Sequence, residues 1–476
     1  MSTSTQAKTT SRLDKSNALS RSLNLIYVYA LATGAIFTFM CYWDGIFMSY
    51  TGPATFLGFG LMTVAVLPIA FLYAELSTML PSAGSALVFN TVGLNKHMGF
   101  WSSWLILLCW ICVPTAGVLG ILDWILYQFK LELSTTGKIV ICIAALAFWC
   151  VLSLFKNVVA GKVQPAMLLL GIAGVLITAV LYLISGSWSF SNFDNFFSTC
   201  LNDAPDKQGG IGWICGLAFL ITPFFGFETV PALVEEGTFP IKDQKKAILG
   251  SVLTCGAVYV LFYFALAGMA PYAELTHGGD CSPFISIEQI VSNYGWGAKY
   301  ALFLGVVGVL FPIGTSVLGF WYSGVRMLYA MGRQNFLPKI FAKTNRYSQP
   351  IVANLLIFAL SVVFLVMPDI SDFFNLMAFA CSCCYIITSI SGLRLAKTKP
   401  EWKRPYKIPG GNVMRVLSLV IATVIAVFCA KGQSAEGWLG FGIAMLIGGV
   451  LWLNMILHKW KKEPVWMLTP DGEQEF

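Results

Sequence analysis

The chain has 476 residues, of which 57% are hydrophobic and only 11% are charged. A soluble domain typically carries about 25% charged residues, so this composition excludes an ordinary soluble enzyme, a disordered chain and a coiled coil. It fits a protein whose surroundings are mostly lipid. The net charge of +7 does not indicate a nucleic-acid partner, because no basic groove with interleaved aromatic residues occurs.

Hydropathy along the chain predicts an all-α membrane protein. A helix that crosses the bilayer needs roughly 20 mostly apolar residues, and twelve segments meet this requirement. Their approximate bounds are 23–49, 53–80, 98–128, 137–155, 164–187, 211–236, 246–272, 298–325, 350–367, 371–393, 413–430 and 437–457. We therefore expect 12 transmembrane helices in one domain, 23–457, between an N-terminal tail (1–22) and a C-terminal tail (458–476).

The basic residues predict the orientation of the chain. Lys and Arg favour the cytoplasmic side of a membrane, and here they concentrate in both tails and in every second loop. The alternate loops hold only Lys130, Lys138, Lys207, Lys299 and Lys431. This predicts a multi-pass protein of the cell membrane with both termini in the cytoplasm. Cys200 and Cys281 would then share the outer side, where a disulfide between them is possible.

Two spans carry residues that interrupt helices near their middles. They are Ala32, Thr33, Gly34 and Ala35 in the first span, and Thr222, Pro223 and Gly226 in the sixth. Proline removes a backbone donor, and glycine lowers helix preference. Breaks at corresponding positions of two halves indicate an inverted-repeat transporter with its site at the membrane midplane, although Gly and Pro are common in membrane helices generally. The freed amides can hold a carboxylate, and the freed carbonyls a cation.

Four motifs at span boundaries resemble those of the amino acid–polyamine–organocation (APC) transporter superfamily. They are Tyr73-Ala74-Glu75-Leu76 with Pro81-Ser82-Ala83-Gly84-Ser85, Phe225-Gly226-Phe227-Glu228 with Glu235-Glu236, Arg326-Met327-Leu328-Tyr329-Ala330-Met331-Gly332-Arg333 with Leu337-Pro338, and Arg404-Pro405-Tyr406-Lys407-Ile408-Pro409-Gly410. The resemblance covers nearly the whole chain. It implies a LeuT-like fold, in which a 5+5 inverted repeat with broken helices 1 and 6 is followed by two C-terminal helices. Repeat one would cover 23–187, repeat two 211–393, and the last two helices 413–457.

This resemblance implies a secondary active transporter that moves an amino acid or a related small amine by alternating access. It would act as an ion symporter or a substrate exchanger, with H⁺ and Na⁺ both open as coupling ions. A passive channel or facilitator on the same fold is the alternative. No P-loop, Ser/His/Asp set or zinc motif occurs in the sequence. We therefore expect neither an enzyme nor a bound cofactor or metal.

The expected substrate-binding residues lie at the two breaks and on the helices that face them. They are Ala32, Thr33, Gly34, Ala35, Cys112, Thr222, Phe224, Phe225, Gly226, Glu228 and Phe320. An intramembrane carboxylate is costly and indicates function, so Glu228 would balance an amine, carry a proton or brace span 1 against span 6. Thr315 and Ser316 are either Na⁺ ligands, as the resemblance implies, or a contact between helices. Glu235, Glu236 and Trp321 are the expected gating residues.

Overall fold

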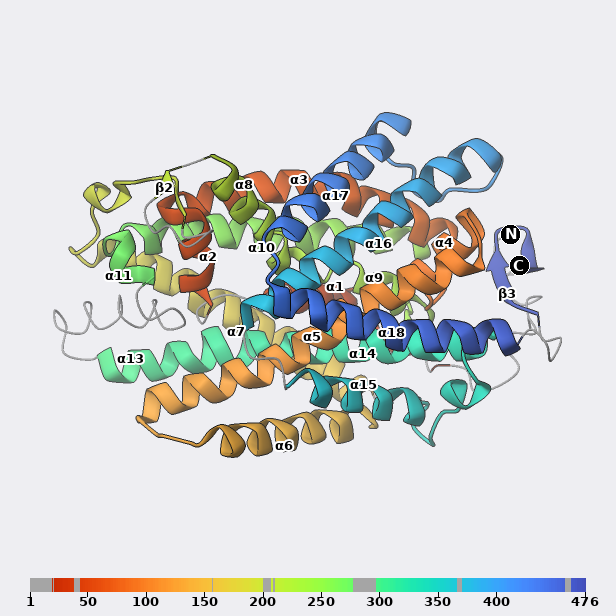
Figure 1. Cartoon of the computed structure of the whole chain (residues 1–476), viewed down its shortest axis with the longest axis horizontal. Coiled ribbons are helices and arrows are strands. Elements are labelled where there is room, and N and C mark those ends of the chain that lie inside the picture. Colours follow the sequence, from red (N-terminus) through yellow and green to blue (C-terminus); the bar gives the residue numbers. More distant parts are fainter. Residues whose placement is uncertain are drawn as a thin grey trace.

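The computed structural model describes residues 19, 21–37, 43–155, 157–199, 207–208, 210–276, 297–365, 370–458 and 464–476. Most of the described chain is helical, and the long helices run roughly along the long axis of the molecule (Figure 1). Within these residues, ten helices are long and apolar enough to cross a membrane. Two shorter apolar helices accompany them, α1 (Leu25–Ile36) and α15 (Ile351–Phe364). The protein is therefore an all-α membrane protein.

The elements follow one another in two groups. After α1 come α2 (Asp44–Thr51), η2 (Gly52–Ala54), α3 (Thr55–Met79), α4 (Ala86–Gly93), α5 (Lys96–Phe129), α6 (Thr135–Ser153) and α7 (Asn157–Ile184). The second group begins with η3 (Phe190–Phe193), β1 (Ser198–Thr199), β2 (Lys207–Gln208), α8 (Gly210–Phe219), η4 (Thr222–Phe224), α9 (Thr229–Ala232), η5 (Val234–Glu236), η6 (Ile241–Asp243), α10 (Gln244–Ala267) and α11 (Tyr272–Thr276). It continues with α13 (Gly297–Leu304), the π-helical η8 (Gly305–Leu310), α14 (Phe311–Arg333), η9 (Lys339–Ala342), α15, α16 (Ile370–Thr398), α17 (Asn412–Lys431), α18 (Ala435–His458), β3 (Trp466–Thr469) and β4 (Gly472–Glu475). The strands form two antiparallel pairs, β1 with β2 and β3 with β4.

Polar side chains mark where several of these helices begin. Asn24 accepts a hydrogen bond from the amide of Tyr27 at the start of α1, and Asn95 accepts two from the first turn of α5. Ser134 caps α6 through the amide of Gly137. Such caps satisfy amides that have no partner within the helix. Between its ends a helix satisfies its own backbone, which the lipid interior cannot do.

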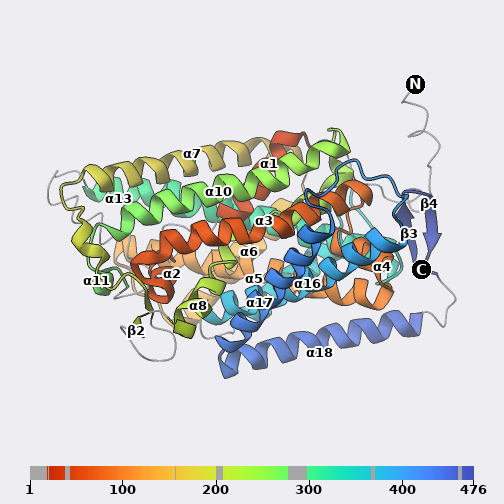
Figure 2. The ribbon, with the colours of Figure 1, turned by 90° about the horizontal axis from the view of Figure 1, so that it is seen from above.

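Burial separates central helices from peripheral ones. The most apolar stretch of α5 is 89% buried, whereas the corresponding stretches of α6 and α18 are only 17% buried. Helix α10 packs along α3 and α1, and α14 packs against α5 and α1. Figure 2 shows α18 along one edge of the molecule. The centre of the protein is therefore built by α1, α5, α10 and α14, and α6 and α18 face the surroundings.

The expected position of the first break is wrong. The sequence predicts an interruption at residues 32–35, but α1 continues through them and ends at Ile36, and α2 begins at Asp44. These small residues serve close packing instead. A Cβ atom on Gly34 would lie only 2.8 Å from the hydroxyl oxygen of Thr315 on α14. Small side chains allow such close approach between membrane helices without unwinding them.

The predicted C-terminal tail contains a folded hairpin. Strands β3 and β4 pair within residues 464–476 and lie beyond one end of the helices (Figure 2). The side-chain amide of Asn335, just after α14, donates to the carbonyl of Pro464 at 2.6 Å. The indole of Trp402 donates to the carboxylate of Asp471, also at 2.6 Å. We call this end of the molecule the hairpin end.

One buried ion cluster also lies toward the hairpin end. Glu75 of α3 is 2.6 Å from the guanidinium of Arg415 on α17 and 3.4 Å from that of Arg404. All three side chains are less than one-tenth exposed. Buried charges are tolerated only when they are paired, so this cluster fixes α17 against α3.

Candidate functional site

The sixth predicted span is interrupted where the sequence predicts it. Helix α8 ends at Phe219, a single 3₁₀ turn follows, and Phe225 is extended. The next residue, Gly226, has a φ angle of +140°, a conformation that side chains other than glycine rarely adopt. The helix resumes only at α9. Backbone at this depth needs protein partners, because lipid supplies none.

The end of α1 packs directly on this interruption. A Cβ atom on Gly226 would lie 2.8 Å from the Cβ of Ala35 and 2.8 Å from the amide nitrogen of Ile36. Tyr259 of α10 joins the two segments, because its hydroxyl lies 2.5 Å from the carbonyl of Ile36 and 3.1 Å from that of Pro223. The end of α1 and the unwound segment of span 6 thus form one contact region, which we call the central junction.

Glu228 is fully buried beside the central junction and is held by neutral donors. Its carboxylate accepts hydrogen bonds from the indole of Trp110 on α5 at 3.2 Å and the hydroxyl of Tyr385 on α16 at 3.3 Å. The amide of Gly226 donates a third, at 2.9 Å. None of the ion pairs among the described residues includes Glu228. Its contacts therefore anchor the break to α5 and α16 rather than to α1.

Two hydroxyl groups of α14 face the last carbonyls of α1. The hydroxyl of Ser316 is 3.2 Å from the carbonyl oxygen of Ala35, and that of Thr315 is 3.4 Å from the carbonyl oxygen of Gly34. Carbonyls at the end of a helix have no partner within the helix. The structure therefore brings Thr315 and Ser316 to the α1 carbonyls, as expected, in a geometry that serves either a helix contact or a cation.

One further residue, which is not among the expected site residues, contacts α14 here. Gln164 of α7 donates its amide nitrogen to the carbonyl of Thr315 at 2.8 Å. Its own side-chain oxygen is buried and has no hydrogen-bond partner among the described residues. An unpaired buried acceptor is costly and calls for an explanation. This contact could not be predicted from the sequence, because Gln164 stands in an apolar run with nothing to indicate which helix it faces.

Aromatic rings surround the central junction. Phe224 packs against Phe59 and Tyr259 at ring-centroid distances of 6.2 and 5.6 Å, and Phe225 lies 6.3 Å from Tyr385. The other expected substrate residues are all buried, namely Ala32 and Thr33 on α1, Cys112 on α5, Thr222 in η4 and Phe320 on α14. Phe320 follows Ser316 by one helical turn and therefore lies on the same face of α14.

One expected gating residue, Trp321, contacts another helix. The indole of Trp321 donates to Asn354 on α15 at 2.9 Å, so it points away from the face of α14 that carries Ser316. The structure does not bring Trp321 to the central junction. Cys200 and Cys281, the possible disulfide pair, lie outside the described residues.

At the hairpin end, two glutamates that follow α9 meet two arginines of α14. Glu236 lies 2.6 Å from the guanidinium of Arg326, and both side chains are fully buried. The guanidinium of Arg326 also donates to Gln349 at 2.9 Å. Glu235 accepts from Arg333 at 2.7 Å. These pairs join the end of span 6 to the end of α14, and we call them the paired gate.

The environment of Glu235 favours its charged form. Burial raises the pKa of Glu235, but the charge and hydrogen bonds of Arg333 outweigh burial and hold the pKa below its ordinary value. Two smaller contributions act in the same direction, since the amide of Ala83 donates to the carboxylate at 3.0 Å and the hydroxyl of Ser82 at 3.2 Å. Glu235 is therefore ionised at neutral pH.

In the described part of the chain, no group of three or more His, Cys, Asp or Glu side chains is arranged to hold a metal ion. The site consists instead of an interrupted helix, a helix end, a buried carboxylate and aromatic rings. Non-helical backbone at membrane depth that faces protein groups in this way is typical of membrane transport proteins.

Comparison with known proteins identifies the family. The family described as amino acid permease matches residues 23–452, so the chain belongs to this family of the APC superfamily. A methylthioribose transporter of Bacillus subtilis (strain 168) is 24% identical, over 94% of this chain and 95% of its own length. A branched-chain amino acid permease of Lactococcus lactis subsp. cremoris is 25% identical, over 84% of this chain and 86% of its own length. Human cationic amino acid transporter 4 is 25% identical, over 73% of this chain and 55% of its own length. The family and these relatives are transporters, not enzymes.

Proposed function

We propose that the protein is a secondary active transporter that moves an amino acid or a related small amine across the membrane by alternating access. The observation that carries this proposal is the central junction, where the interrupted span 6 packs on the end of α1. A fixed site between two half-helices, which opens alternately to either side, is the general design of such transporters. Family membership and the relatives named as amino acid transporters support the substrate class.

The proposed architecture is the 12-helix inverted repeat. In it, α1 and α2 form the interrupted span 1, and α8 and α9 the interrupted span 6. Repeat one covers 23–187, repeat two 211–393, and α17 and α18 are the two additional helices. The distribution of the basic residues supports a cytoplasmic hairpin end, and the cell membrane is the proposed location. Spans 1, 2, 6 and 7 would rock against spans 3, 4, 8 and 9.

The central junction suits the ammonium group of a substrate. The C-terminal end of a helix carries a partial negative charge, and the last carbonyls of α1 lie there. Glu228, whose carboxyl group accepts from the amide of Gly226, would add a negative charge there when it is ionised. Phe224 and Phe225 supply ring faces, which attract cations. A substrate carboxylate would have to use other groups, since Glu228 already occupies the amide of Gly226.

The coupling ion remains to be assigned between Na⁺ and H⁺. Hard cations prefer oxygen ligands. Four oxygens lie together where α1 and α14 meet, namely the carbonyls of Gly34 and Ala35 and the hydroxyls of Thr315 and Ser316. The side-chain amide of Gln164 on α7 contacts the same segment of α14, and its oxygen has no partner among the described residues. This set favours Na⁺. Protonation of Glu228 is the route that H⁺ would use.

The paired gate would close the cytoplasmic side. Its two ion pairs join span 6, which would move with α1, to α14, which would belong to the other group of spans. Opening toward the cytoplasm therefore requires that Glu235 separate from Arg333 and Glu236 from Arg326.

The test is a ligand screen followed by transport in proteoliposomes. A ligand that binds only the folded protein raises its apparent stability, so purified protein is heated with amino acids and small amines, each with and without Na⁺. Hits are then tested for uptake driven by an ion gradient and for counterflow, in which internal substrate accelerates entry of labelled substrate. Counterflow is the expected result. Counterflow with passive uptake that is never concentrative would instead assign a facilitator, and passive flux without counterflow would assign a channel.

A further inference from the structure

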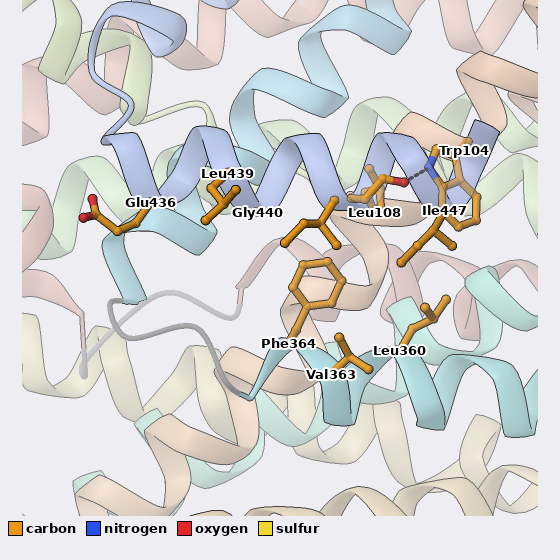
Figure 3. A pocket seen from close by; sticks show the side chains of 11 residues that line it. Trp104, Leu108, Leu360, Val363, Phe364, Glu436, Leu439, Gly440 and Ile447 are labelled. Atoms are coloured by element: carbon orange, nitrogen blue, oxygen red, sulfur yellow. Dashed lines mark hydrogen bonds between the residues drawn. The ribbon is translucent and has the colours of Figure 1, made fainter. Parts of the chain in front are cut away.

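A groove on the periphery of the protein lies between α18, α5 and α15 (Figure 3). It encloses about 450 Å³, within the range of small-molecule sites. Its walls are apolar, with Leu108 of α5, Phe364 of α15 and Ile443 of α18 among them. Glu436 is the one charged residue of the lining and stands at one end, in the first turn of α18. The central junction shares none of these residues.

The length of the groove matches one leaflet of a bilayer. It follows α18 from Glu436 to Ile447, and eleven residues of helix rise about 17 Å. The hydrocarbon core of a bilayer is about 30 Å thick. Because Glu436 stands at the start of a membrane-spanning helix, the groove runs from one membrane surface to roughly the middle of the bilayer.

The width of the groove matches a hydrocarbon chain. Spread over about 17 Å of helix, 450 Å³ corresponds to a cross-section of about 26 Å². A second protein helix, about 10–12 Å in diameter, is too wide to enter. The neighbouring apolar side chains of α18 are open to the surroundings, for example Leu439 (67% exposed) and Leu446 (73% exposed). Lipid tails therefore have direct access to the groove.

We propose that this groove binds one acyl chain of a phospholipid whose headgroup carries a primary ammonium, as in phosphatidylethanolamine. The chain would lie along Leu439, Ile443 and Phe364, and the ammonium would lie near the carboxylate of Glu436. Glu436 is exposed, and none of the ion pairs among the described residues includes it. The negative charge of Glu436 favours a headgroup that carries an ammonium group and disfavours an anionic lipid such as phosphatidylglycerol.

The bound chain would complete the packing of α18. At the inner end of the groove, the indole of Trp104 on α5 donates to the carbonyl of Ala444 at 3.0 Å and ties the two helices together. Toward Glu436 the groove separates them. A hydrocarbon chain there would supply the contacts that α5 and α18 do not make with each other, so its removal should loosen the first half of α18.

The experiment measures lipid retention by native mass spectrometry and melting temperature in detergent. The full-length protein is stripped of lipid and then supplied with phosphatidylethanolamine or phosphatidylglycerol of identical acyl chains. We expect about five-fold greater retention of phosphatidylethanolamine, the order of effect of one exposed charge pair, and a higher melting temperature with the lipid bound. Equal retention of both lipids, or retention of detergent alone, would overturn the proposal.

Three variants locate the site. Gly440→Phe fills the groove from α18, and Val363→Trp fills it from α15, so each variant should lose retention of both lipids. Two filling variants are used so that the test still works if one of them fails to fold. Glu436→Gln should retain lipid but lose the preference. Leu446→Trp, on the exposed face of α18 and outside the groove, is the control and should behave as the parent protein. Normal lipid retention by both filling variants would refute the site. A dimer of the parent protein that only these two variants abolish would also refute it, because the groove would then bind a second copy of the chain.

Discussion

Buried carboxylates are held in two different ways in this protein. At the central junction, Glu228 accepts hydrogen bonds from an indole, a phenol and a backbone amide, all of them neutral. At the paired gate, Glu235 and Glu236 each meet an arginine. Neutral donors stabilise a carboxylate without cancelling its charge, whereas an arginine cancels it. Under the proposed function, Glu228 would serve a substrate or a proton at the centre, and the ion pairs of the paired gate would serve closure.

The largest expected effect comes from breaking the buried pair of the gate. Arg326→Ala leaves Glu236 buried without its cation, and such a loss costs about 3–5 kcal/mol. The melting temperature in detergent should fall strongly. The double variant Arg326→Met/Glu236→Gln removes both charges and should recover most of the loss. If the double variant is as unstable as Arg326→Ala, packing rather than charge explains the effect.

Gly226→Ala tests the close approach at the central junction. The new Cβ would lie 2.8 Å from Ala35 and Ile36, at a φ angle that alanine rarely adopts. Strain of this kind costs about 1–3 kcal/mol, and transport should fall with stability. Gly442→Ala on α18 is the matched control, because its Cβ would meet nothing within 4 Å. A fully active and stable Gly226→Ala would show that α1 and the break are not tightly coupled.

Glu228→Gln removes the central charge and keeps the shape of the side chain. One of its two acceptor oxygens becomes a donor, which leaves at least one of the three neutral donors unpaired, at a cost of about 1–3 kcal/mol. We expect transport to be abolished or uncoupled from its ion while membrane insertion remains intact. Uptake into proteoliposomes and binding of a cationic substrate measure this. Normal transport would reduce Glu228 to a packing residue.

The pH dependence of stability tests the ion pair between Glu235 and Arg333 in the paired gate. Because the pKa of Glu235 is lowered in the folded protein, its contribution to stability is complete above its unfolded pKa. The contribution is lost as the pH falls from about 4.5 through the lower folded value. Arg333→Gln should therefore be less stable than the parent protein at pH 7, and the difference should shrink with acidification. A difference that is independent of pH would contradict this assignment.

The smallest expected effect concerns the oxygen cluster at the end of α1. Thr315→Val removes one hydroxyl and keeps the volume, so it should cost only about 0.5–1.5 kcal/mol through the lost hydrogen bond. If Na⁺ binds there, the variant should also lose any stabilisation that Na⁺ gives the parent protein. Ser323→Ala on the same helix is the control, since its hydroxyl bonds within α14. Equal responses to Na⁺ in the parent and Thr315→Val would remove Thr315 from the ion site.

The sequence could predict the helices and one of the two interruptions. Long apolar runs have few alternatives to helix in lipid, and Pro223 with Gly226 disfavours helix strongly enough to locate the second break. The first break was misplaced, because small residues around Gly34 are equally compatible with unwinding and with close packing. Two of the four motifs contain Glu235, Glu236, Arg326 and Arg333, which the structure pairs. A gating role for these residues stays a prediction.

Other parts of the site depend on tertiary contacts that leave no pattern in the sequence. Tyr259, Tyr385 and Gln164 each stand in an apolar run, and only the packing of α10, α16 and α7 decides what they touch. The hairpin at residues 464–476 was missed because its strands are four residues long and pair only once they lie against Asn335 and Trp402.

The cluster of Glu75, Arg404 and Arg415 has a consequence for how the protein is made. The carboxylate and Arg415 are 340 positions apart. At a synthesis rate of about 5–20 residues per second, Glu75 therefore enters the membrane roughly 20–70 s before its partners leave the ribosome. During this interval α3 carries an uncompensated charge. Chains that end before residue 404 never receive the partners and therefore keep a carboxylate of α3 without its cations.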